Sequence, residues 1–188
     1  MSTTEIPLLP ENWYHIYNRG INGQQLFFEQ QNYDFFLKLL GLHVLGVAEI
    51  YAYCLLGNHF HLLVRILAKP QKRPHLGFSN LFNSYAQATN KKYNRTGSLF
   101  ERPFRRKLID SEIYRAQVLF YIHHNPVHHG LCDDFRHYPH SSYRGILSDL
   151  ATHLKRLEVL EWFEGREGFV EFHHSKPDFE DIRNYVIE

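Results

Sequence analysis

The sequence predicts an α+β fold of the ferredoxin-like type, an antiparallel sheet with crossover helices on one face and the other face partly open. Hydrophobic residues recur alternately at strand and at helix spacing, and the resulting order is strand, helix, strand, strand, helix, strand, helix. At 188 residues, with 44% hydrophobic residues, the chain can bury one ordinary core. We place one domain at residues 1–146 and an acidic, helical extension at residues 147–188.

The first strand and first helix are predicted near the N-terminus. Residues 13–18, Trp-Tyr-His-Ile-Tyr-Asn, are rich in aromatic and β-branched side chains and end at a glycine-containing loop, so they predict a strand. Hydrophobic residues then recur at helical spacing from Asn32, which is a candidate N-cap, to Gly41 or Gly46.

A hairpin and the second half of the domain follow. Residues 49–56 and 59–67 are extended runs separated by Gly57-Asn58, which predicts two antiparallel strands. Residues 79–93 repeat at helical spacing, and residues 104–109 predict a short strand. The last helix of the domain begins after Asp110 or Ser111 and is expected to end near Asn125, because Pro126 follows.

The extension differs from the domain in composition. From Asp149 onward it holds ten Asp/Glu against five Lys/Arg, and its leucines recur at helical spacing. Such a segment could mask a basic surface, pack over the sheet or mediate self-association, and the sequence does not choose among these roles.

The composition also bears on the compartment. Two cysteines are too few for a disulfide framework and fit a reducing cytoplasm, which is the predicted location. The longest apolar stretches are too short and too interrupted to cross a bilayer, so no membrane partner is expected.

The overall net charge of +1 hides a basic segment between Arg65 and Lys107. Eleven Lys/Arg face one acid there, a net +10, which leaves −9 for the rest of the chain. Phenylalanine and tyrosine rings are interleaved with these charges, as in surfaces that attract phosphate and stack bases, although the same rings could form core. The charge count selects four DNA-binding candidates: Lys91, Lys92, Arg95 and Arg106.

Two short motifs carry the candidate chemistry. On a strand, His59 and His61 share one face, opposite the apolar row that marks the buried side, and could hold one cation. Tyr121 and Asn125 are four residues apart and would share one helix face. On spacing alone, however, Tyr121 and Asn125 are equally an ordinary core stripe before a proline.

Together these residues suit phosphodiester cleavage without water as the nucleophile. A tyrosine hydroxyl can attack phosphorus in line while a cation neutralises the non-bridging oxygens, and the phenolate is a good leaving group for the reverse step. Two imidazoles and an amide oxygen leave coordination positions open, which suits Mg²⁺ or Mn²⁺ better than a closed zinc site. His123 and His124 are candidate proton carriers, unless helix geometry turns at least one of them to solvent.

Four stretches in the same order resemble the REP-associated tyrosine transposases of the HUH single-strand transposase family. They are residues 14–20 (Tyr-His-Ile-Tyr-Asn-Arg-Gly), 58–64 (Asn-His-Phe-His-Leu-Leu-Val), 98–104 (Ser-Leu-Phe-Glu-Arg-Pro-Phe) and 121–127 (Tyr-Ile-His-His-Asn-Pro-Val). Two departures stand out: Gly57 replaces a common proline, and the acidic extension has no counterpart.

The resemblance implies a function and a set of roles. His59 and His61 would be metal ligands with Asn125 as the third, and Tyr121 the nucleophile that forms a 5′-phosphotyrosine link. It implies DNA contacts for Arg19, Arg102 and Arg105. The expected partner is single-stranded DNA with hairpin or palindromic repeats. Members of the family include homodimers that exchange the tyrosine helix and monomers that do not, so both assemblies stay open here.

Two other classes of function fit parts of the sequence. A non-catalytic, domesticated nucleic-acid-binding regulator on the same fold would keep the basic segment and the rings without cleavage. A metal-dependent hydrolase of small molecules would need a carboxylate ligand, and none stands beside the histidine pair. The intact set of His59, His61, Tyr121 and Asn125 favours the nuclease.

Overall fold

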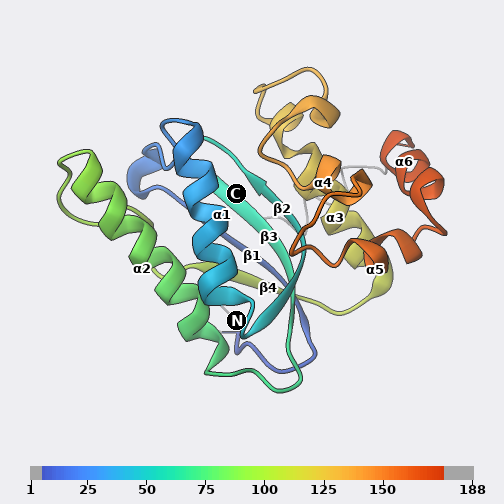
Figure 1. Ribbon diagram of the computed structural model, residues 1–188, viewed down its shortest axis with the longest axis horizontal. Coiled ribbons are helices and arrows are strands. Elements are labelled where there is room, and N and C mark those ends of the chain that lie inside the picture. Colours follow the sequence, from blue (N-terminus) through green and yellow to red (C-terminus); the bar gives the residue numbers. More distant parts are fainter. Residues whose placement is uncertain (1–5, 176–188) are drawn as a thin grey trace.

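The structure, a computed structural model that describes residues 6–175, contains a four-stranded antiparallel sheet with helices on both faces (Figure 1). The strands are β1 (Trp13–Arg19), β2 (Ala48–Leu55), β3 (His59–Ile66) and β4 (Arg105–Ile109), paired in the order β2-β3-β1-β4. Helix α1 (Gln30–Val44) connects β1 to β2, and α2 (Pro74–Lys92) connects β3 to β4. This order and pairing confirm the predicted fold class.

Helices α1 and α2 lie side by side on one face of the sheet and enclose the first hydrophobic core (Figure 1). The apolar row of β3 faces this core, as strand alternation predicted. Four rings of the basic segment are buried in the same core: Phe78, Phe82, Tyr85 and Phe100. Phe78 and Tyr85 are therefore structural, whereas Phe82 and Phe100 also line a groove on the surface.

The other face is more closed than the sequence predicted. Helix α3 (Glu112–His128) packs on this face against β2 and β3, and α4 (Tyr143–Leu147), α5 (Arg156–Glu161) and α6 (Arg166–His174) lie around it, on the side of the sheet away from α1 and α2 (Figure 1). A second core forms there around Leu63, Val118, Ile122 and Phe169, all fully buried. Two short 3-10 turns, Ile21–Gly23 and Phe135–His137, complete the described elements.

Two predicted helix starts are wrong. Asn32 is not the N-cap of α1 but its third residue, where its side-chain oxygen accepts hydrogen bonds from the backbone N–H groups of Phe28 and Glu29. The cap is Glu29, because the two side chains form a reciprocal capping box. Helix α2 starts at Pro74, five residues before the expected position, since proline suits the first turn of a helix.

The predicted end of the last domain helix is also wrong. Ser111 caps α3 by accepting from the Tyr114 N–H, but the helix runs through Pro126 to His128. Proline lacks an N–H, so only the bond to the Ile122 carbonyl is lost, and Asn125 and Pro126 are both buried by packing. Tertiary contacts here outweigh the local preference to stop.

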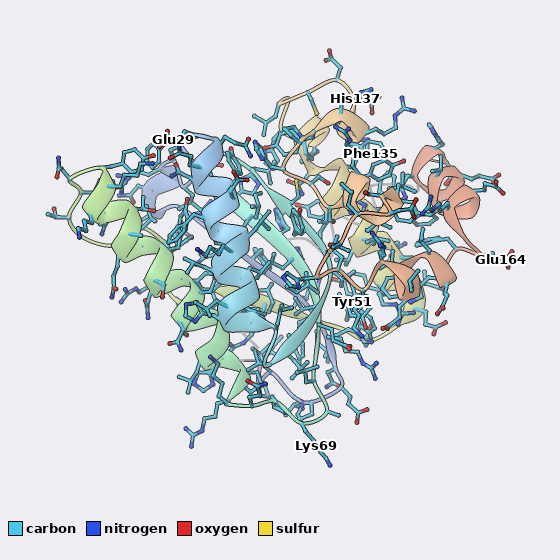
Figure 2. All side chains as sticks on the ribbon, viewed as in Figure 1. Glu29, Tyr51, Lys69, Phe135, His137 and Glu164 are labelled. Carbon is cyan, nitrogen blue, oxygen red and sulfur yellow. The ribbon has the colours of Figure 1, made fainter. Side chains whose placement is uncertain are left out.

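The C-terminal segment packs over the sheet, one of the three roles left open for it. Trp162 of this segment stacks on Tyr51 of β2 at 5.4 Å between ring centroids, and the Tyr51 hydroxyl donates to Glu158 at 2.8 Å. Tyr51 is labelled in Figure 2, where it lies beside this segment. Residues 176–188 of the predicted extension lie outside the described residues. Within residues 6–175, no helix is long and apolar enough to span a membrane.

If α6 is part of the core, Phe169→Ala should lower the free energy of unfolding by about 3–5 kcal/mol, the usual cost of emptying a buried phenylalanine site. Phe169 is fully buried, whereas Leu157 on α5 is 71% exposed and gives a matched control in Leu157→Ala. Urea denaturation followed by circular dichroism measures both. Equal stability of Phe169→Ala and the wild type would mean that the C-terminal segment is an appendage and not core.

Candidate metal and nucleic-acid site

Strand β3 carries the two predicted imidazoles on the face covered by α3. The His59 and His61 rings are 5.3 Å apart, centroid to centroid, and lie edge to face. His61 is buried, and His59 is half-buried at the end of the strand. In the neighbouring strand β1, Tyr17 lies opposite His61 and Arg19 opposite His59.

The orientation of His59 leaves a lone pair facing Asn125. Its Nδ1 lies 2.7 Å from the Asn58 side-chain oxygen, an acceptor, so Nδ1–H donates and Nε2 carries the lone pair. That Nε2 lies 3.4 Å from the Asn125 Oδ1, another acceptor. Two ligands of one cation would stand in this way, and with the Asn125 amide turned over its N–H would instead donate to His59.

His61 is oriented by a histidine that the sequence did not single out. The His61 Nδ1 lies 2.9 Å from the His15 Nε2, and both rings are buried. The other nitrogen of His61, Nε2, is also buried and has no hydrogen-bond partner within the described part of the chain. In the tautomer in which the His61 Nδ1–H donates to His15, the His61 Nε2 lone pair is available as a ligand, whereas in the opposite tautomer His15 donates and Nε2 carries the proton.

Tyr121 of α3 packs directly on the imidazoles. Its ring is edge-on to His61 at 5.4 Å and to His15 at 6.1 Å. The Tyr121 hydroxyl is buried, and the residue does not line the open cavity beside the histidines. The structure thus brings Tyr121 and Asn125 together with His59 and His61. The phenol of Tyr121 contacts the imidazoles but does not reach the cavity.

A cavity of about 170 Å³ opens beside His59 and His61 and is walled by two of the predicted DNA-binding residues, Arg19 and Arg105. The Glu101 carboxylate holds both guanidinium groups, at 2.6 Å from Arg19 Nε and 3.4 Å from Arg105. The rim of the cavity therefore keeps a net positive charge, because the single Glu101 carboxylate offsets only one of the two guanidinium groups.

The other basic candidates lie farther away. Arg102 and Arg106 line a neighbouring groove of about 400 Å³ that shares Asn18 with the cavity. Lys91 and Lys92 stand at the end of α2, where Lys92 pairs with Glu29, and Arg95 donates to Gln24. The structure does not place Lys91, Lys92 or Arg95 at either opening.

The donor set could hold a divalent cation and leave coordination positions open. Among residues 6–175, no cluster of three or more His, Cys, Asp or Glu side chains could hold a metal ion, so a cation here depends on the Asn125 amide. His59 Nε2, His61 Nε2 and Asn125 Oδ1 supply two nitrogens and one oxygen, leaving positions for phosphate and water.

Comparison with known proteins bears on the fold. No family sequence model and no curated protein matches the chain. Among solved structures, the chain is similar to a REP-associated tyrosine transposase bound to a REP hairpin, with a TM-score of 0.63 and 16% sequence identity over 81% of this chain and 90% of that one. At this identity the likeness shows a shared fold.

Two site residues were missed by sequence reasoning. His15 becomes visible only once β1 is paired with β3, because its role follows from that register. His129 lies four residues beyond Asn125 and contacts the His59 ring at 4.5 Å, on the wall of the cavity. The spacing of Tyr121, Asn125 and His129 could have indicated it, had the helix not been expected to stop at Asn125.

Because the buried histidines are neutral, we expect the free energy of unfolding to fall in acid when no metal is present. Burial, with Lys107 nearby, lowers the pKa of His15 to about 3 from 6.5. Between these pH values the unfolded chain binds more protons, so stability is complete above pH 6.5 and falls toward pH 3, by about 1.4 kcal/mol per pH unit for one such histidine.

Urea denaturation across this pH range in a chelator checks the slope. His15→Gln should show a shallower pH dependence than the wild type, and the exposed His174→Gln should match the wild type. Identical slopes for His15→Gln and the wild type would contradict a neutral His15.

Proposed function

We propose that this protein is a metal-dependent single-strand DNA endonuclease and transposase of the HUH tyrosine type, acting on hairpin-associated DNA. The observation that carries the proposal is the convergence of His59 and His61 from β3 with Tyr121 and Asn125 from α3 within one chain. The fold-level likeness to a transposase bound to a REP hairpin supports the choice of DNA as substrate.

In this proposal His59, His61 and Asn125 hold Mg²⁺ or Mn²⁺. When bound, the cation would neutralise the non-bridging oxygens of the scissile phosphate and orient it. His15 keeps the His61 ring in the tautomer that a ligand needs, since the hydrogen bond at Nδ1 decides which nitrogen is bare. Asn58 does the same for His59.

The Tyr121 oxygen would attack the phosphorus and displace the 3′ oxygen of the preceding nucleotide. A bond from phosphorus to the phenol oxygen forms, the bond to the 3′ oxygen breaks, and the phenol proton leaves while the 3′ oxygen gains one. Attack by a different 3′ hydroxyl on the 5′-phosphotyrosine would rejoin strands. Because the Tyr121 hydroxyl is buried, the ring has to turn toward the cavity before attack.

The DNA backbone would approach along the rim of the cavity. Arg19 and Arg105 are paired with Glu101 in the free protein, and a phosphate would compete with that carboxylate for both guanidinium groups. Arg102 and Arg106 extend the basic surface along the neighbouring groove. Lys91, Lys92 and Arg95 stay in the proposal as contacts to DNA outside the site.

A non-catalytic nucleic-acid-binding regulator is the second candidate. One observation favours it: the nucleophile candidate is 6% exposed and its hydroxyl is covered. Such a protein would bind hairpin DNA without cutting it, so cleavage assays separate the two candidates.

Tyr121→Phe should abolish covalent capture of DNA. Wild-type protein incubated with a labelled hairpin oligonucleotide and Mn²⁺ is expected to give an adduct that survives denaturing electrophoresis, and the variant should lose it by at least about 10³-fold in rate. Tyr17→Phe is the matched control, because Tyr17 lines the cavity but has no assigned chemistry. An adduct that persists in Tyr121→Phe would exclude Tyr121, and binding without any adduct in wild type would favour the regulator.

Metal binding should depend on the same residues. We expect His61→Ala to lose Mn²⁺ binding measured by electron paramagnetic resonance, and His15→Phe to weaken it about 10- to 100-fold, the usual effect of removing a group that orients a ligand. His43→Ala on α1 controls for loss of an unrelated imidazole. Unchanged Mn²⁺ affinity in His61→Ala would contradict the site.

A further inference from the structure

A chain of buried hydrogen bonds joins α6 to the helix that carries Tyr121. The His173 Nδ1 lies 2.8 Å from the Phe169 carbonyl oxygen, and its Nε2 lies 2.9 Å from the His123 Nδ1. The His123 Nε2 lies 2.8 Å from the Ser142 Oγ, which accepts from the Tyr53 N–H.

The direction of every bond in this chain is fixed by its ends. A carbonyl can only accept, so the His173 Nδ1–H donates to Phe169 and the His173 Nε2 is an acceptor. The His123 Nδ1–H must then donate to it, which leaves the His123 Nε2 to accept from the Ser142 hydroxyl. His123, Ser142 and His173 are at most 2% exposed, and each of their polar side-chain atoms has a partner.

The His123 side chain extends from α3 on the side away from the site. Tyr121 and Asn125 share one face of the helix, and a residue two positions from each is turned about 200° away. The hydrogen bond that proline removes, at the Ile122 carbonyl, lies between Tyr121 and Asn125. Backbone hydrogen bonding alone therefore holds these two residues less firmly than it would in an uninterrupted helix.

We infer that His173, acting through His123, is a positioning residue that holds the Tyr121–Asn125 turn of α3 against β3. This rests on the proposed function, because it assigns α6 a part in aligning that nucleophile and that ligand. The C-terminal segment is then part of the working site, although it contributes no group to the reacting atoms.

The test compares the single-turnover rate of adduct formation, at saturating hairpin oligonucleotide and Mn²⁺, in His173→Leu and in the matched control His174→Leu. Misplacing the Tyr121 turn should lower the rate about 10- to 100-fold in His173→Leu, with the Kd for DNA unchanged. His174 is exposed next to His173, so its variant should react like the wild type. His173→Gln keeps an acceptor for the His123 Nδ1–H and should restore most of the rate.

A second control, Phe78→Leu, lowers the stability of the protein without disturbing α3, because it weakens the first core on the other side of the sheet. It should keep the wild-type rate, while hydrogen exchange of the α3 peptides should rise in His173→Leu only. If His173→Leu does not fold, His173→Phe decides, since it keeps a ring in the α6 packing and removes the acceptor for the His123 Nδ1–H.

The outcomes distinguish the two proposals. If the wild type forms no Tyr121-dependent adduct, the proposed function is overturned. If the wild type forms it and His173→Leu, or His173→Phe in its place, reacts at the wild-type rate, the function stands and the positioning role is overturned.

Discussion

The packing of α3 against β2 and β3 is the contact on which the candidate site depends. The imidazoles and the phenol and amide are about sixty residues apart in sequence, and they meet because the second core seats α3 over the face of β3 that carries His59 and His61. Alternation along β3 separates that face from the one buried by α1 and α2. The side chains of β3 thus contribute to both cores, and His59 and His61 lie where the second core meets the cavity.

Burial sets the electrostatics of this pair. Removal from water penalises the charged form of an imidazole, and the nearby imidazoles add to it, so the pKa of His61 lies well below its usual range. A neutral His61 keeps a lone pair near neutral pH, and a metal ligand requires that lone pair. A surface histidine near its own pKa would be protonated for part of the time and would then lack it. The charge is kept at the rim, where Arg19 and Arg105 share Glu101.

The sequence could predict the elements and their order because strand and helix periodicities are local. It could also place His59 and His61 on one face, since alternation needs no partner strand. The role of His15 depends on the register between β1 and β3, and that register is a long-range property. The predicted stop at Pro126 failed for a related reason: burial of Asn125 and Pro126 supports a turn that local preference would end.

The sequence did not predict that the second face of the sheet is covered, because that too depends on long-range contacts. Acidic composition marked the C-terminal segment as different, but composition does not reveal where a segment docks. Its contacts hold α3 near both ends. Near the start, the Arg115 guanidinium lies 4.6 Å from the Trp13 ring and 4.3 Å from the Trp162 ring, and near the end His123 bonds to His173.

Beyond its first turn, a helix held in this way is buried or half-buried up to Pro126, whereas His128 and His129 are exposed and His129 lines the cavity. In the proposed function, the buried Tyr121 hydroxyl would be exposed by rotation of its own side chain and not by movement of the whole helix. In such an arrangement the second core does not only stabilise the fold. It also limits the motions by which the phenol can reach the opening, so residues far from the reacting atoms can govern how the candidate nucleophile is presented.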